Sequence, residues 1–188
     1  MGEQGGHAGR PGGDAYVPLT LTSIRGASAA VAGLALTAST LTWTLGAWIQ
    51  ERRINAWGPR RLIRMGFAFV AAGAAGMTTL LSHATPVWLG PVMWGVAGLG
   101  IGLAYAPISV TVLHHALPGE EGQASSALAL TDVLGTALGT GTGGAAVAFG
   151  HAHGWDPRAG LAFAFGIASV VAITGATIAR RIPVRLSD

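Results

Sequence analysis

The sequence contains no cysteine and no lysine, and only 10% of its 188 residues are charged. Without cysteine there is no disulfide framework, no thiol chemistry and no cysteine-ligated zinc site. Without lysine there is no phosphate-binding P-loop, because that motif requires one. Soluble domains usually carry about 25% charged residues. The shortage of charge therefore argues against a soluble globular protein.

Hydrophobic residues make up 51% of the chain and gather in long runs, which contain no charge except Asp132. The runs cover residues 26–50, 65–82, 86–113, 122–149 and 159–179. A helix needs about 20 apolar residues to cross a bilayer, and helices satisfy their own backbone polar groups in lipid. The sequence predicts an all-α, polytopic membrane helix bundle with about five transmembrane helices.

The remaining segments complete the predicted organisation. Residues 1–14 form a polar, glycine-rich tail without the charged and apolar regions of a cleavable signal peptide. Residues 15–182 form the transmembrane domain, in which we expect a loop over 51–64. Residues 183–188 form a short C-terminal tail.

Arginine supplies all 11 basic residues, and eight of them follow the first or the last run. These eight share one side of a five-span topology, and the positive-inside rule makes that side cytoplasmic. The sequence thus predicts a cell-membrane protein with a cytoplasmic C-terminus. Because the arginines flank apolar runs and do not form a basic face, we expect no nucleic-acid partner.

The fourth run contains a stripe of small residues. Gly135, Gly139 and Gly143 are four residues apart, a spacing that lets membrane helices approach closely. Gly139, Gly141 and Gly144 also match a dinucleotide-binding pattern, but that pattern requires a preceding strand. We therefore interpret Gly135, Gly139, Gly143 and Gly144 as a helix-packing motif.

Asp132 shares a helix face with Gly135 and Gly139. A carboxylate inside a span is unfavourable in lipid and marks either an ion, proton or substrate path or a hydrogen bond between helices. We expect Asp132 to face a neighbouring helix or a cavity. Its interpretation as a transport or coupling residue and its interpretation as a structural group both stay open.

The other polar residues are weaker indications of a functional site. Thr37, Thr40 and Thr44 share a face that could line a polar path, although such threonines more often bond to their own helix carbonyls. The histidines lie at span ends without metal-binding spacing, and no nucleophile constellation is present. We expect no metal, no cofactor and no enzymatic activity.

Three stretches resemble the major facilitator superfamily, especially drug:proton antiporter-like members from high-GC actinobacteria. Residues 15–37 resemble the end of the first helix of a C-terminal half, its outer loop and the start of the second helix. Residues 46–61, GAWIQERRINAWGPRR, resemble the cytoplasmic loop motif between the second and third helices of a half. Residues 135–144, GTALGTGTGG, resemble the antiporter motif, with Thr140 in place of proline.

The resemblance assigns the loop motif to Gly46, Glu51, Arg52, Gly58, Arg60 and Arg61. Glu51 stands where the family has aspartate, and the spacing before Gly58 is longer than in the family. The resemblance implies a permease for small molecules, a proton-coupled exporter that works by alternating access between two halves.

The same resemblance implies that the chain is incomplete on its own, because substrate sites in such carriers lie between the halves. Its expected partners are the lipid bilayer, an unknown small-molecule substrate, and either a missing N-terminal half or a second copy. The alternative is a non-transporting assembly or interaction subunit that uses its glycine-rich helix faces.

Overall fold

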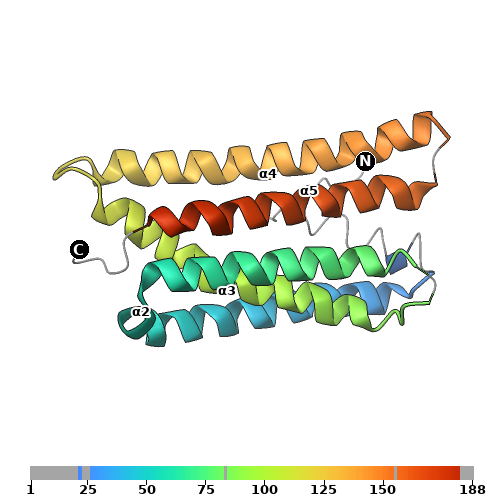
Figure 1. Ribbon diagram of the computed structural model, residues 1–188, viewed down its shortest axis with the longest axis horizontal. Helices are drawn as coiled ribbons and strands as arrows, with labels where there is room; N and C mark the ends of the chain where they lie inside the picture. The colour runs from blue at the N-terminus through green and yellow to red at the C-terminus, as the bar shows by residue number, and fades with distance from the viewer. Residues whose placement is uncertain (1–20, 23–25, 83, 155, 183–188) are drawn as a thin grey trace, which may run out of the picture.

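The computed structural model describes residues 21–22, 26–82, 84–154 and 156–182, and every regular element in these ranges is helical. The elements are α2 (Ala29–Thr79), α3 (Leu89–His114), α4 (Glu121–Ala152), α5 (Pro157–Ile178) and the 3-10 helix η2 (Ala179–Arg181). Figure 1 shows the long helices lying side by side along a common direction. The prediction of an all-α membrane helix bundle is confirmed.

Hydropathy, and not length, distinguishes α4 from the other long helices. Among the described residues, α2, α3 and α5 with η2 are long and apolar enough to cross a membrane. α4 has 32 residues but is less apolar, because glycine, threonine, serine and Asp132 interrupt its hydrophobic residues. Whether α4 crosses the bilayer stays a prediction. α2 has 51 residues, enough for two crossings of about 20 residues each.

An elbow at Gly58 divides α2 into a first arm (29–57) and a second arm (59–79), which returns alongside the first (Figure 1). Gly58 has φ 71° and ψ 159°, a conformation that is open almost only to glycine. Pro59 then starts the second arm, since the first position of a helix needs no N–H donor. The segment 51–64, expected to be a loop, is instead helical on both sides of Gly58. Its arginine, glutamate and alanine residues are good helix formers, so loss of hydrophobicity alone does not end the helix.

α3 lies against both arms of α2 and meets them through glycines. A Cβ atom added at Gly98 would lie 2.8 Å from a backbone carbon of the first arm, and one added at Gly102 would lie 3.0 Å from another. A Cβ added at Gly100 would lie 2.8 Å from a backbone nitrogen of the second arm. These separations are shorter than real Cβ contacts, so the close approach of the three helical segments requires glycine at these positions.

A cluster of buried side chains lies away from the elbow. Leu21, Met77 and Leu80 are fully buried there, beside Trp94 of α3 and Phe165 of α5. This cluster joins α5 to the α2–α3 unit. α5 also contacts the second arm at Gly175, where an added Cβ would lie 2.8 Å from the ring of Phe67.

Gly98→Ala and Gly139→Ala form a matched pair of substitutions. We expect Gly98→Ala to lower the free energy of unfolding of the purified chain in detergent by about 1–3 kcal/mol, the usual effect of overpacking. Gly139 has nothing within 4 Å of an added Cβ. Gly139→Ala should therefore leave stability unchanged or raise it by about 0.5–1 kcal/mol. Chemical denaturation followed by circular dichroism measures both, and equal effects would contradict the proposed packing.

Candidate functional site

Asp132 lies in the first half of α4, on a stretch that the rest of the described chain leaves open. Its side chain is exposed, as are those of Thr131, Val133 and Leu134. Among the described residues, none forms a hydrogen bond or ion pair with its carboxylate. Figure 1 shows α4 running along the outer edge of the bundle. The expected contact with a neighbouring helix is thus not made by the described helices of this chain.

The predicted packing motif on α4 divides into two parts. Gly135 and Gly139 have nothing within 4 Å of an added Cβ, whereas Gly143 is buried and Gly144 is half-buried. Beyond Gly143, α4 packs against α5, where a Cβ added at Gly160 would lie 2.9 Å from the Cα of Val147. The second half of α4 is therefore anchored to this chain, and the first half presents glycine and aspartate to its surroundings.

This exposure has an energetic consequence for a helix in lipid. An aspartate at the centre of a membrane helix opposes insertion by about 2.5–3.5 kcal/mol when no polar surroundings compensate it. A hydrogen-bonding partner or a water-filled cavity beside α4 would remove most of that penalty. The open stretch around Asp132 is consequently the part of the molecule that most needs a covering surface.

The threonines of the first arm behave as structural groups. Thr37, Thr40 and Thr44 each donate a hydrogen bond to a carbonyl four residues earlier in α2. The Thr42 hydroxyl lies 2.8 Å from the Ala38 carbonyl of its own helix and also reaches across to α3, where the Gly95 carbonyl accepts its hydrogen bond at 2.6 Å. Sequence reasoning missed Thr42, although it lies at small-residue spacing from the buried Gly46 and could have been found by that signal.

The residues of the predicted loop motif have separate structural roles. Gly46 is buried against α3, Gly58 forms the elbow, and Glu51 is exposed. Arg60 donates a hydrogen bond from Nε to the carbonyl of Ile182, just beyond η2. This bond ties the start of the second arm to the end of the α5–η2 segment.

Arginines and tryptophans alternate around the elbow. The guanidinium of Arg52 lies 4.2 Å from the ring centroid of Trp48. Those of Arg53 and Arg61 each lie 5.4 Å from the centroid of Trp57. Such cation–π pairs hold the guanidinium groups over the indole rings. Arg180 and Arg181 of η2 end at the same side of the bundle (Figure 1). We call this side the arginine end.

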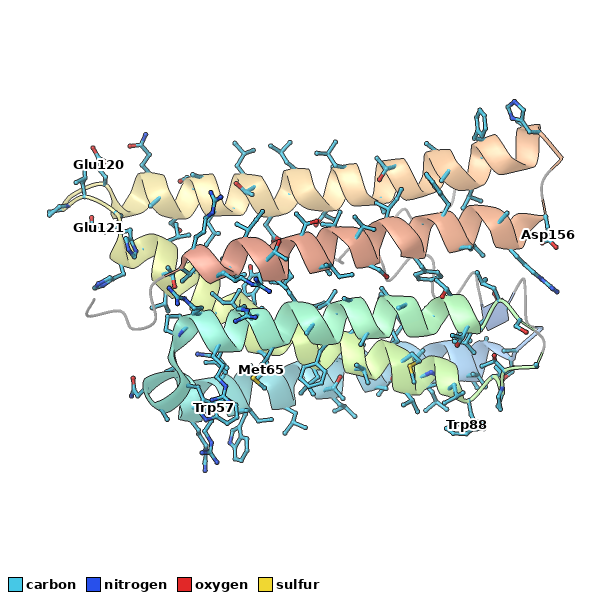
Figure 2. The ribbon with its side chains drawn as sticks, viewed as in Figure 1. Trp57, Met65, Trp88, Glu120, Glu121 and Asp156 are labelled. Carbon is cyan, nitrogen blue, oxygen red and sulfur yellow. The ribbon has the colours of Figure 1, made fainter. Side chains whose placement is uncertain are left out.

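The opposite end of the bundle is different. Arg158 is the arginine found there among the described residues, and its Nε lies 4.0 Å from the carboxylate of Asp156. Trp88 is exposed at this end, whereas Trp57 lies at the arginine end (Figure 2). Tryptophans at both ends of a bundle are typical of the two membrane interfaces. Trp155, a further candidate anchor, lies outside the described residues.

A groove of about 540 Å³ opens at the arginine end, between the second arm and α5. It is lined by Arg60, Arg61, Arg64, Met65, Ala68 and Ala176. No group of three or more histidine, aspartate or glutamate side chains gathers among the described residues. The described site thus consists of an open carboxylate on α4 and a cationic groove at one end of the bundle.

These helices define an all-helical membrane protein. The chain is similar to the riboflavin transporter RibZ of Clostridioides difficile (strain 630), with 29% identity over 124 residues. The alignment covers 66% of this chain and 27% of that transporter. No protein-family model matches the chain, and no solved structure matches it significantly. The likeness supports a role in transport and favours a non-enzymatic one.

Cysteine labelling tests the predicted orientation, because the chain has no cysteine of its own. Ala56 and Ala84 are exposed near opposite ends of the bundle. In intact cells we expect a membrane-impermeant maleimide to label Ala84→Cys, and to label Ala56→Cys only after permeabilisation, since the arginine end should be cytoplasmic. The unsubstituted chain is the control and should not be labelled, because it has no cysteine. The reverse pattern would overturn the orientation.

Proposed function

We propose that this chain is part of a permease of the major facilitator superfamily that moves a small molecule across the cell membrane. In this proposal it forms the C-terminal half of the carrier and exchanges its substrate outward for protons. The resemblance of residues 46–61 and 135–144 to the family's motifs supports the family, and the likeness to a riboflavin transporter supports the transport role.

The open first half of α4 is the observation that carries the proposal. This stretch presents small residues, which favour close helix contact, together with a carboxylate that is unfavourable in lipid. Both features fit a helix that faces a second half of the carrier across the substrate path. The chain spans about a quarter of the length of its relative, since the alignment covers 27% of it. We therefore propose that residues outside this chain supply the surface that covers the first half of α4.

The substrate is proposed by chemical class. The relative is named for riboflavin, a flat, neutral, nitrogen-rich ring system with a polyol chain. We propose a small organic solute for this chain, with riboflavin as the first compound to test. Arginines of the described chain lie at the ends of the bundle and not along the open face of α4, which fits a substrate that does not need several cations to hold it.

A second candidate function depends on the same helix. The open Gly135 and Gly139 positions would equally suit a non-transporting subunit that binds another membrane protein. The two functions differ in whether ionisation of Asp132 matters. Packing needs the small residues alone, whereas proton-coupled transport needs a group that takes up and releases a proton.

The chain reconstituted alone in liposomes should not transport riboflavin, because one wall of the proposed path is absent. Fluorescence of riboflavin retained in the vesicles measures uptake. Saturable uptake that is inhibited by non-fluorescent riboflavin analogues would contradict the proposal that the single chain is incomplete. Gly135→Cys then identifies the partner surface: a disulfide-linked dimer through this residue would show that a second copy supplies it.

Asp132→Asn should abolish transport driven by a pH gradient in membranes that contain the assembled carrier. Asparagine keeps the shape and hydrogen-bonding capacity of aspartate but cannot ionise. Asp132→Glu, which can ionise, is the matched control and should retain part of the activity. The measurement is substrate transport into inverted vesicles under an imposed pH gradient. The amount of protein is checked by immunoblot. Normal transport by Asp132→Asn across pH would leave Asp132 a structural group.

A further inference from the structure

The groove at the arginine end is amphipathic along its length. Arg60, Arg61 and Arg64 line one part, and Met65, Ala68 and Ala176 line the other. From Arg60 to Ala68 the second arm advances about 12 Å, at 1.5 Å per residue. The groove therefore passes from cationic to apolar over the distance that separates a phospholipid head group from the upper part of its acyl chains.

The charge of the groove is not neutralised by the described protein. The ion pair that the structure gives among the described residues, Arg158 with Asp156, lies at the opposite end of the bundle. Glu51 lies in the first arm before Gly58, and Glu120 and Glu121 lie at the arginine end (Figure 2), but none approaches an arginine nitrogen within 4 Å in the described chain. Arg60 is held by the Ile182 carbonyl, a contact that positions the guanidinium and leaves its positive charge in place.

The position of the groove relative to the membrane is marked by Trp57, which lies beside the elbow and whose ring contacts Arg61 (Figure 2). Tryptophan concentrates at the level of the lipid head groups. Arg61 and Arg64 are exposed on the second arm, within about two turns of the elbow. The three guanidinium groups are thus at the depth where lipid phosphates lie.

We propose that this arginine groove binds the head group of an anionic phospholipid from the surrounding leaflet. Guanidinium groups recognise phosphate oxygens with paired hydrogen bonds. Basic pockets between membrane helices on one side of a bilayer suit such head groups. The apolar stretch formed by Met65, Ala68 and Ala176 favours a lipid over a soluble phosphate compound, because a soluble ligand has no chain to cover it. Occupancy would link the second arm to the α5–η2 segment and so stabilise the arginine end.

Native mass spectrometry of the purified chain with added lipid tests this proposal. The probes are phosphatidylglycerol and phosphatidylcholine with identical acyl chains, so that only the net charge of the head group differs. We expect phosphatidylglycerol to bind more tightly. Arg61→Gln with Arg64→Gln should weaken its binding about twenty-five-fold, or about fivefold for each arginine. Phosphatidylcholine binding should change little.

Arg52→Gln is the matched control, because Arg52 stacks on Trp48 outside the groove. It should leave phosphatidylglycerol binding within about twofold of the parent. This change is smaller than the loss of about fivefold expected for one groove arginine. An equal loss in Arg52→Gln would overturn the site and indicate diffuse attraction. Equal binding of the two lipids by the parent would overturn it as well. Competition by glycerol phosphate at the same concentration as the lipid would identify a soluble-phosphate site and also contradict the proposal.

The double variant removes two exposed side chains, so the fold should survive, and a thermal melt followed by circular dichroism checks this. If the double variant does not fold, Arg64→Gln alone provides the test, with about a fivefold loss expected. None of these readouts depends on transport. Failure of the lipid site is therefore distinguishable from failure of the proposed transport function.

Discussion

The close backbone contact between α3 and α2, which leaves no room for side chains, determines how the rest of the bundle is arranged. α3 fits between the two arms because Gly98, Gly100 and Gly102 bring backbone against backbone. Helices in lipid gain little from burying apolar surface and depend on close packing and hydrogen bonds between backbones and small side chains. The Thr42–Gly95 hydrogen bond at 2.6 Å lies in this contact. With the arms fixed on α3, the elbow and its arginines are held at one end, and α5 packs on the outside.

α4 contrasts with this tightly packed unit. Its first half presents Asp132, Gly135 and Gly139 without a described neighbour, although small residues and carboxylates are unfavourable choices for a lipid-facing surface. The same type of residue, glycine at spacings of three or four, is used in α3 within the chain and is left open in α4. Packing thus differs along one molecule: α2 and α3 contact each other backbone to backbone, and the first half of α4 is open.

Much of the helical arrangement could be predicted from the sequence, since long uncharged runs interrupted by arginine, proline and paired glutamates indicate where helices lie. The elbow could not. A loss of hydrophobicity over 51–64 indicated a loop, but helix propensity and the absence of a strong helix breaker before Gly58 extend the helix. The glycine patterns of α3 and α4 look alike in sequence. Which one packs internally depends on a partner surface distant in the chain, and local spacing does not encode that choice.

For the candidate site, the sequence identified Asp132 and the arginines around Gly58 but not their surroundings. The groove depends on residues from α2 and α5 that are more than one hundred positions apart, from Arg60 to Ala176, and no local pattern joins them. The openness of Asp132 likewise follows from where α4 lies and not from its neighbours in sequence. The roles of both regions stay proposals, whereas their positions in the bundle are described by the structure.

The glycine contacts of α3 also restrict how the molecule can change shape. A shift of α3 by one residue along either arm would set a side chain where only a hydrogen atom now fits, so sliding at these contacts is sterically blocked. The two arms and α3 must then travel together as a rigid body. Gly119, with φ 89° in the connection before α4, lies where this body ends. Any reorientation during a working cycle would accordingly move these three segments as one unit, whereas the second half of α4 stays tied to α5.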